Sequence, residues 1–406
     1  MGLFRTLRSV ARFSPLTVSR RKRRLDRAAN VHDLRLLARR RLPRGIFDYI
    51  DGGAEDEVTM RRNSDAFQNY SFVPRVLTDV SDIDTSTTFL GQHLPFPLIF
   101  SPTGFTRIAH SQGELSVARV AAKHQLPYCL STLSTRSIEE VAAVSTGPKW
   151  FQVYVWRDRA LVKDMLSRAE QHGYTAIMLT VDTAVLGRRE RDVRRGFTLP
   201  PTLGLNTIVD GILHPNWTWD FVRNDPITFA NISGHGGADS GTAVTLSDFI
   251  SDQFDPALSW DDIEWFRANW NGHIIIKGIQ SVNDAVRAQG AGVDAIALSN
   301  HGGRQLDGSP APLELLAPVA DATSGRLPLI CDGGIRRGSD IVKALALGAS
   351  ACTMGRAYLY GLGAAGEAGV EKALSMLTSE TVRTMQLLGA TRLAEITSSS
   401  VTRIQS

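Results

Sequence analysis

Residues 273–299 read HIIIKGIQSVNDAVRAQGAGVDAIALS, in which two short apolar runs flank a helical pattern. The runs cover 273–277 and 295–299 and are rich in Ile, Ala and Leu, while the helical pattern covers 281–289. Strands that are apolar throughout, rather than at alternate positions, are buried on both faces, as in a parallel sheet covered by helices. The stretch therefore predicts one strand–helix–strand unit of a parallel α/β fold.

The same unit recurs along the chain at spacings that leave room for one helix between strands. Eight runs of this kind are strand candidates, at 97–101, 127–131, 150–155, 176–181, 273–277, 295–299, 328–332 and 351–355. Helical patterns lie between them at 113–124, 158–172, 281–289 and 338–347. Eight parallel strands with intervening helices predict a TIM (β/α)8 barrel. An open doubly wound sheet would usually have fewer strands and an early GxGxxG turn, which we do not find.

Three segments lie outside this repeat. Residues 31–75 predict helices that precede and cap the barrel, and 367–389 a long C-terminal helix. Between the fourth and fifth strands the spacing widens to an insertion over about 187–262, rich in Gly, Pro, Trp and Asn. A long irregular connection is usually functional or disordered. Its tryptophans are interpreted either as packing on the barrel rim or as part of an interface.

The composition is that of a globular protein. Of the 406 residues 43% are hydrophobic and 21% charged, and no apolar run approaches the ~18 residues of a membrane span. Three scattered cysteines exclude a disulfide scaffold and a cysteine-built zinc site, and they fit a reducing cytosol. No metal site is expected.

The charge is unevenly distributed. Residues 1–44 hold 14 Lys and Arg against two acids, whereas the rest of the chain holds 31 against 39. We expect a basic N-terminal tail over 1–30 and one catalytic domain over 31–406. The tail fits an anionic membrane surface, a transit peptide or a solvated disordered tail. Nucleic acid is not expected, because no RNA-binding signature follows the basic run.

Polar residues follow each predicted strand, at the barrel end where TIM barrels build their active sites. Strand seven is followed by Asp332-Gly333-Gly334-Ile335-Arg336-Arg337 and strand eight by Gly355-Arg356. Glycines allow close backbone approach and guanidinium groups bind phosphate bidentately. These two clusters predict a phosphorylated ligand.

Three further residues carry candidate chemistry. His301 follows the sixth strand with Arg304 three residues later, a pairing suited to taking a proton from a substrate whose carboxylate the arginine binds. Asp182, after strand four, is interpreted either as the partner of His301 or as a helix N-cap. Lys277 ends a buried strand, which implies an anionic partner or a cofactor ring, with a Schiff base as the alternative. The loop 187–192 (GRRERD) is typical of solvated surface.

These motifs together resemble a known family. Residues 299–308 (SNHGGRQLDG) are similar to the signature of the FMN-dependent α-hydroxy acid dehydrogenases and oxidases. The resemblance spans roughly residues 31–400 and leaves out the basic tail. It is carried further by LP at 42–43, FDY at 47–49, GGAEDE at 52–57, PTG at 102–104, TVD at 180–182, GRR at 187–189, GRA at 355–357 and GEAGV at 366–370.

The resemblance implies a role for each site residue. The FMN phosphate would lie on Arg336, Gly355 and Arg356, and Asp332 would hold the ribityl chain beside Gly333 and Gly334. The residues implied around the flavin ring are Pro102, Thr103, Gly104, Ser131, Gln152, Thr180, Lys277 and Ser299. Those implied for substrate binding and catalysis are Tyr49, Tyr154, Arg189, Arg304, His301 as base and Asp182 as its partner.

The resemblance also implies the reaction, the oxidation of an L-2-hydroxy acid to the 2-oxo acid. Gly104, where glycolate oxidases have alanine, resembles the mandelate and several lactate dehydrogenases. Leu133, with Phe105 after Gly104, makes the pocket similar to that of quinone-linked bacterial L-lactate dehydrogenases. The segments 213–217 and 220–223 are instead similar to mandelate dehydrogenase, and an oxidase that reduces dioxygen remains an alternative. A flavin-free barrel that binds a phosphorylated ligand is the non-redox alternative. We expect a homotetramer, cytoplasmic and peripherally attached to the inner face of the membrane where the quinone resides.

Overall fold

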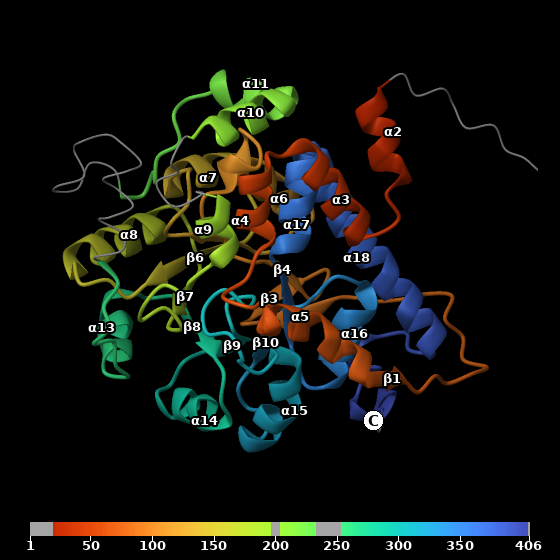
Figure 1. The fold of residues 1–406 in the computed structure, drawn as a ribbon. Coiled ribbons are helices and arrows are strands. Elements are labelled where there is room, and N and C mark those ends of the chain that lie inside the picture. The colour runs from red at the N-terminus through yellow and green to blue at the C-terminus, as the bar shows by residue number, and fades with distance from the viewer. Residues whose placement is uncertain (1–18, 196–203, 233–252, 405–406) are drawn as a thin grey trace, which may run out of the picture.

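The computed structural model describes residues 19–195, 204–232 and 253–404 (Figure 1). Its centre is a closed parallel barrel in the strand order β10-β11-β4-β5-β6-β7-β8-β9. The strands are β4 Leu98–Phe100, β5 Tyr128–Ser131, β6 Lys149–Tyr154, β7 Ala176–Thr180, β8 His273–Ile279, β9 Ala295–Ser299, β10 Leu329–Asp332 and β11 Ala351–Met354. All eight predicted strands, and the TIM barrel, are confirmed.

The barrel interior is a small apolar cluster distinct from the outer core between strands and helices. Its members include Ile99, Trp150, Met178 and Ile275, one from each of four strands. The hairpin of β2 (Thr87–Phe89) and β3 (Gln92–Leu94) covers one end of the barrel, because Phe89 and Leu94 belong to this same cluster. At the other end of the barrel, where the carboxyl ends of the strands meet, polar side chains line the interior.

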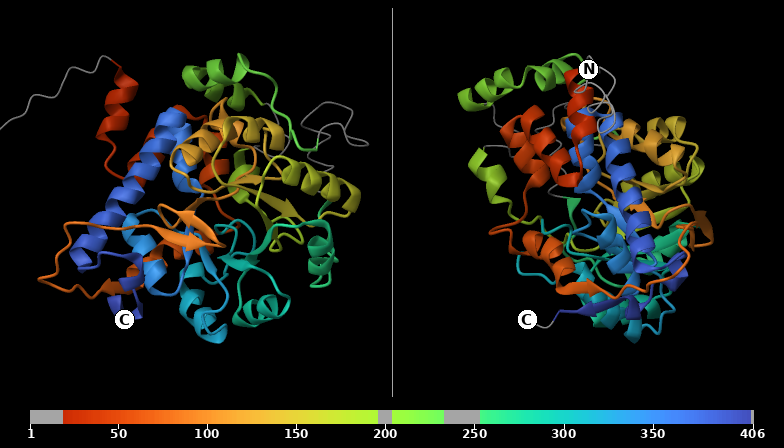
Figure 2. Two further views of the ribbon diagram at one scale, coloured as in Figure 1. Left: turned by 180° about the vertical axis from the view of Figure 1, so that it is seen from behind. Right: turned by 90° about the vertical axis from the view of Figure 1, so that its right-hand side faces the viewer.

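Helices surround the barrel (Figure 2). The helices between and after the strands are α6 Gly113–Lys123, α7 Ile138–Val144, α8 Arg159–Gln171, α13 Asp262–Asn269, α14 Val282–Gly290, α15 Pro312–Ala322, α16 Gly338–Ala346, α17 Arg356–Ala365 and α18 Glu367–Leu388. The expected C-terminal helix is α18, which packs against α17 and α16. Gly361 and Gly369 allow the α17–α18 contact, since a Cβ on Gly361 would lie 2.2 Å from the carbonyl oxygen of Gly369.

The segment before the barrel is helical as predicted, with one exception. It contains α2 Arg20–Arg27, α3 Val31–Arg41, α4 Arg44–Asp51, α5 Val58–Asp65 and the short 3-10 helix η1 Ala66–Asn69. The exception is Tyr70–Phe72, which forms strand β1 and pairs antiparallel with β12, Val401–Arg403. Disorder is therefore wrong for residues 20–27 of the basic tail, which form a helix capped by the Ser19 side chain, whereas the basic side chains from Arg21 to Arg27 are exposed to solvent. Residues 1–18 lie outside the described part.

The insertion is less irregular than predicted. It contains the helices α9 Glu190–Arg195, α10 Leu205–Leu213 and α11 Pro215–Val222. Helix α10 forms because residues 205–213 are amphipathic, and α11 begins at Pro215 because proline suits the first turn of a helix. The Trp217 indole donates to the carbonyl of Ile108 at 2.7 Å, so it packs on the barrel rim, whereas Trp219 is exposed. The buried Arg107 donates to the carbonyls of Asp225 and Pro226 and anchors the chain that follows α11.

Candidate active site

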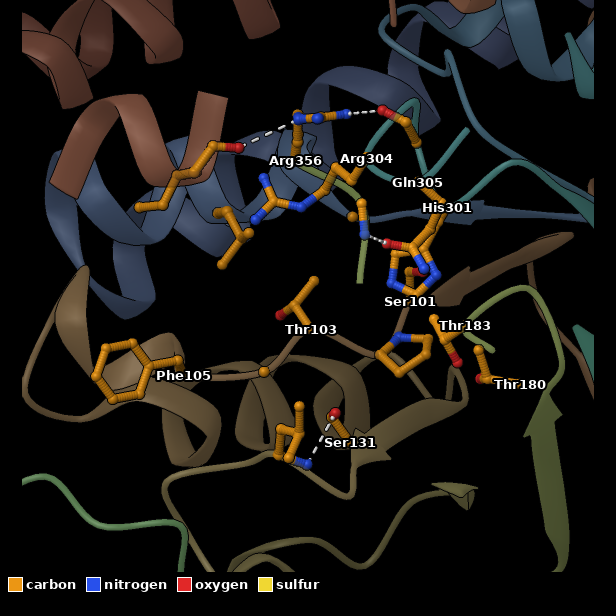
Figure 3. Close-up of a pocket in the computed structure, with 18 of the residues that line it drawn as sticks. Ser101, Thr103, Phe105, Ser131, Thr180, Thr183, His301, Arg304, Gln305 and Arg356 are labelled. Carbon is orange, nitrogen blue, oxygen red and sulfur yellow. Dashed lines mark hydrogen bonds between the residues drawn. The ribbon is translucent and has the colours of Figure 1, made fainter. Parts of the chain in front are cut away.

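A cavity of about 420 Å³ opens at the carboxyl ends of the barrel strands. Figure 3 shows Arg304, His301, Thr103 and Ser131 arranged around one space. The predicted residues that line it are Tyr49, Pro102, Thr103, Gly104, Ser131, Leu133, Gln152, Tyr154, Thr180, Arg189, Lys277, His301, Arg304, Asp332, Gly333, Gly334, Arg336, Gly355 and Arg356. Of the predicted site residues, only Asp182 and Ser299 lie behind this lining.

His301 and Asp182 form a buried pair. Nδ1 of His301 lies 2.9 Å from Oδ1 of Asp182, whose side chain is 1% exposed, while the imidazole is 25% exposed toward the cavity. A carboxylate at Nδ1 holds the proton there, so Nε2 is the basic nitrogen that faces the cavity. His301 has a φ of 57°, a left-handed conformation that is strained for a residue with a Cβ and is typical of functional sites.

Asp182 is not a helix cap. The next helix, α9, begins eight residues later at Glu190, so the N-cap interpretation is wrong. Two neighbours fix the position of Asp182: Gln305 donates to its carbonyl at 3.0 Å, and Gly278 lies against its side chain. A Cβ on Gly278 would lie 2.7 Å from the Cβ of Asp182, so only glycine fits there. The structure therefore favours the partnership with His301.

The two arginines predicted to bind a carboxylate both lie close to the ring of Tyr49. The guanidinium carbons of Arg189 and Arg304 lie 5.2 and 5.1 Å from the Tyr49 ring. Burial, together with the nearby charge of Arg189, lowers the pKa of Arg304 to about 9, so it remains a cation at neutral pH. Burial, with the nearby Asp182, raises the pKa of Tyr154, so that its phenol stays protonated. An anionic carboxylate would relieve the repulsion between the two guanidinium groups.

Lys277 has the anionic partner that the sequence implied. Its Nζ lies 2.9 Å from Oδ2 of Asp332 and 3.1 Å from Oγ of Ser299. Burial alone would lower the pKa of Lys277, but Asp332 outweighs it and raises the pKa, so the amine stays charged. Asp332 also accepts from Ser101 and Thr353. Burial opposes its ionisation, but the charge of Lys277 and the hydrogen bonds from Thr353 and Ser299 outweigh burial and hold the pKa of this carboxyl well below its ordinary value. A charged lysine is not a Schiff-base nucleophile, which removes that alternative.

Polar side chains also connect the ends of the three neighbouring strands β5, β6 and β7. Ser131 donates to Gln152 at 2.9 Å, and Gln152 donates to Thr180 at 2.9 Å. Across the cavity, Thr103 makes a short hydrogen bond to Tyr358. These groups form a polar wall beside the buried ammonium of Lys277 that can bind the edge of a heterocycle.

The predicted phosphate residues meet at the start of α17. Gly355 is the N-cap of this ten-residue helix, and Arg356 is its first residue. A helix N-terminus with two guanidinium groups nearby is a favourable site for phosphate. The Arg356 guanidinium also donates to the carbonyls of Ile50, Gly302 and Gly52 at 2.7 to 3.1 Å, so it joins this end of the cavity to α4 and the His301 loop.

An aromatic wall was not predicted. Phe229 and Phe254 come from the insertion and line the cavity, although nothing in their local sequence marks them. The ring of Phe229 lies 5.4 Å from that of Phe105, and the ring of Phe254 lies 5.2 Å from that of Tyr154. Their burial, at 3% and 5% exposure, becomes apparent only in the structure.

Comparison with known proteins decides the family. A family model described as FMN-dependent dehydrogenase matches residues 38–403. The chain belongs to the FMN-dependent dehydrogenases. It is 43% identical over 372 residues to an L-lactate dehydrogenase of Caulobacter vibrioides, an alignment that covers 91% of this chain and 96% of the relative. It is 42% identical over 360 residues to an (S)-mandelate dehydrogenase of Pseudomonas putida, covering 89% and 90%.

The fold comparison agrees. A crystal structure described as a monotopic membrane protein, (S)-mandelate dehydrogenase, matches with a TM-score of 0.89 and 40% identity, covering 93% of this chain and all of that one. The chain is thus an FMN-dependent oxidoreductase acting on 2-hydroxy acids. The cavity fits the cofactor, because its helix N-terminus and arginines suit a phosphate and its buried Lys277 suits an electron-rich ring.

Proposed function

We propose that the protein oxidises L-lactate to pyruvate and passes the electrons to a membrane quinone. One observation carries the proposal: the His301–Asp182 pair faces the same cavity as Arg189 and Arg304, so a base and a carboxylate site share one space. The names of the relatives support lactate, and a lipophilic acceptor is supported by the surface described below.

The side chains suggest a division of labour. Arg189 and Arg304 bind the substrate carboxylate, and the protonated phenol of Tyr154 donates to the substrate hydroxyl. His301 takes a proton at Nε2, and Asp182 stabilises the imidazolium that results. FMN supplies a two-electron acceptor when bound, with Lys277 beside its ring and Arg336, Gly355 and Arg356 on its phosphate.

A larger substrate is the second candidate, and the aromatic wall favours it. The ring of Tyr49, which lies close to both arginines, contacts Phe105 with ring centres 6.3 Å apart, and Phe105 contacts Phe229. A side chain at C2 of a bound hydroxy acid would therefore extend along apolar rings, as an aromatic acid such as L-mandelate requires. Lactate, with one methyl group, would leave part of this wall uncovered.

A substrate and acceptor panel tests the proposal. The purified flavoprotein would be mixed with L-lactate, glycolate or L-mandelate, and each reaction followed with a quinone analogue and with dioxygen. We expect the highest kcat/KM with L-lactate and turnover with the quinone analogue that exceeds turnover with oxygen. Preference for L-mandelate would favour the second candidate, and rapid reoxidation in air would favour an oxidase that forms hydrogen peroxide.

One side of the molecule combines apolar and basic side chains. Helices α10 and α11 lie on the same side as the basic helix α2 in all the views of Figures 1 and 2. The large apolar side chains exposed on α10 and α11 are Ile208, Val209, Ile212, Leu213, Trp219, Phe221 and Val222. Helix α2 exposes the basic residues Arg21, Lys22, Arg23, Arg24 and Arg27. No helix in the described ranges is long and apolar enough to cross a membrane.

We infer that this side binds the surface of an anionic membrane, which brings the cavity to a lipophilic acceptor. Apolar side chains enter the interface and each basic residue near it adds roughly 1 kcal/mol of attraction to anionic lipid. The test is co-sedimentation with vesicles of phosphatidylglycerol and phosphatidylcholine. Arg23→Gln with Arg24→Gln, and separately Ile212→Glu with Leu213→Glu, should each release the protein while activity with a soluble acceptor is kept.

Matched controls separate local from general charge effects. Arg326→Gln with Arg403→Gln removes the same charge from exposed positions near α15 and β12, on the opposite side of the molecule. This control should sediment with vesicles as the wild type does. Equal release by both pairs of arginine substitutions would mean that net charge, and not this surface, governs binding.

A further inference from the structure

Arg191 lies outside the cavity and joins two elements that build it. It belongs to α9, and its guanidinium bridges two carboxylates of the N-terminal segment, with a third, Asp48, farther away at 3.9 Å. Nη1 lies 2.9 Å from Oδ2 of Asp51 at the end of α4, and Nη2 donates to Glu57 directly before α5. The side chains of Asp51 and Glu57 are 3% and 11% exposed, so both carboxylates that pair with Arg191 are shielded from water. The solvated-surface interpretation of 187–192 is therefore wrong for Arg191.

The same two elements carry substrate-site residues. Tyr49 is two residues before Asp51 on α4, and Arg189 directly precedes α9. Because Arg189 stacks on the Tyr49 ring, the way α9 lies on α4 sets the position of this guanidinium in the cavity. Arg191 is the ion-paired residue of α9 that contacts α4 directly.

The arrangement has to resist a repulsive force. Arg189 and Arg304 are both cations, and the pKa of Arg304 is lowered by burial and then by Arg189. Without substrate the two guanidinium groups, both close to the Tyr49 ring, therefore repel each other. Asp192, 2.6 Å from Nε of Arg189, offsets part of this repulsion. Besides Arg191, this loop is also held by the amide of Glu55, which donates to the carbonyl of Arg188 at 3.0 Å, and by the Gln305 side chain, which accepts from the amide of Gly187 at 2.9 Å.

We propose that Arg191 is a positioning residue for the substrate carboxylate: it holds α9 on α4 and so keeps Arg189 and Tyr49 in register. The inference rests on the proposed function, because it assigns the carboxylate to Arg189. Arg191 contacts neither His301 nor Asp182, so it acts on substrate affinity and leaves the proton-transfer step intact.

The protein should fold without this side chain. Asp51 keeps two hydrogen bonds from Arg35, at 2.5 and 2.7 Å, and one of 2.8 Å from Tyr360. Glu57 keeps the amide of Gly53 at 2.9 Å. Both carboxylates therefore retain partners, and the effect of removing Arg191 stays local.

The experiment is anaerobic stopped-flow reduction of the bound flavin by L-lactate, which separates the dissociation constant from the limiting reduction rate. In Arg191→Gln we expect the dissociation constant to rise at least about tenfold and the limiting rate to stay within about threefold, since misplaced binding groups weaken binding strongly. The dissociation constant of Arg191→Lys should lie between those of the wild type and Arg191→Gln, because an ammonium cannot bridge two carboxylates as a planar guanidinium does. Arg194→Gln is the matched control, an exposed arginine of the same helix paired only with Glu190 among the described residues, and should behave as wild type.

The outcomes are distinct. Suppose that L-lactate reduces the wild-type flavin and that Arg191→Gln has the same dissociation constant as the wild type. This result would leave the proposed function intact and overturn the positioning role. Equal falls in affinity, reduction rate and melting temperature would also overturn it, since they indicate a general structural role. A wild-type flavin that none of L-lactate, glycolate and L-mandelate reduces would overturn the proposed function and this role together.

Discussion

At the scale of single residues, the pair of His301 and Asp182 carries the chemistry. Asp182 fixes the proton on Nδ1 and stabilises the imidazolium, so Asp182→Asn should leave the geometry intact and favour the wrong tautomer. We expect flavin reduction to slow by at least about 10²-fold with FMN still bound. The rate is measured by stopped flow, and Asp284→Asn, an exposed substitution in α14, serves as the control. A rate within threefold of wild type would show that His301 does not need this carboxylate.

The buried pair of Lys277 and Asp332 sets a second prediction. Lys277→Met leaves the Asp332 carboxylate buried without its cation, so the free energy of unfolding should fall by about 3–5 kcal/mol. Adding Asp332→Asn removes the unpaired charge and should recover part of this loss. Urea unfolding of the three proteins provides the test. Losses that simply add in the double variant would contradict a direct coupling between the two groups.

Residue roles were harder to predict than residue positions. His301, Arg304, Lys277 and Asp332 could be found because each lies near or shortly after the carboxyl end of an apolar strand, in a fold that collects strand ends at one edge. The left-handed backbone of His301, and Asp332 as the counter-ion of Lys277, depend on neighbours distant in sequence. No local pattern encodes either feature.

At the scale of elements, the segment that follows α11 forms part of the cavity wall. Asn231 anchors it by donating to Ser134 and accepting from the amide of Ile138, both at 2.9 Å, and this fixes Phe229 against Phe105. Phe229→Ala should lower kcat/KM for L-mandelate by about tenfold or more and for L-lactate by less than about threefold. Phe229→Leu, which keeps most of the apolar volume, should lie close to wild type. Equal losses for both substrates would contradict a subsite for the C2 side chain.

The network around Asp51 joins α3, α4, α9 and α17 and predicts a pH dependence. Burial opposes ionisation, but hydrogen bonds from Arg35 and Tyr360 outweigh it and lower the pKa of Asp51 from 3.8 to about 2. A depressed pKa contributes stability above pH 4 that is lost as the pH falls toward 2, here about 2 kcal/mol. The difference in unfolding free energy between wild type and Asp51→Asn should therefore shrink over this range. A constant difference would contradict the assignment.

The elements differ in how far sequence predicts them. The eight barrel strands were found because burial on both faces leaves uninterrupted apolar runs, as in Ala176–Thr180, where all five residues are buried. Strands β1, β2 and β3 are three residues long and partly exposed, so no such run marks them. Helices α10 and α11 escaped prediction because Gly211, Pro215 and the nearby tryptophans interrupt the local helical pattern.

At the scale of the whole molecule, the excess of basic residues near the N-terminus coincides with one helix on one side of the structure. The basic residues 20–27 form a helix at the periphery, on the side where α10 and α11 expose apolar side chains. Residues 31–400 carry every candidate site residue, so the basic helix serves attachment and not chemistry in our proposal. A homotetramer remains our proposal for the assembly, and light scattering on the purified protein measures it.

The most direct test of the account compares wild type with His301→Gln in one anaerobic stopped-flow experiment, with L-lactate and D-lactate as substrates. We expect L-lactate, and not D-lactate, to bleach the wild-type flavin, because the base and the arginines define one handed site. His301→Gln should retain FMN and lose at least about 10³-fold in the rate of bleaching. Bleaching of the variant within tenfold of the wild-type rate would contradict the central claim that His301 is the base.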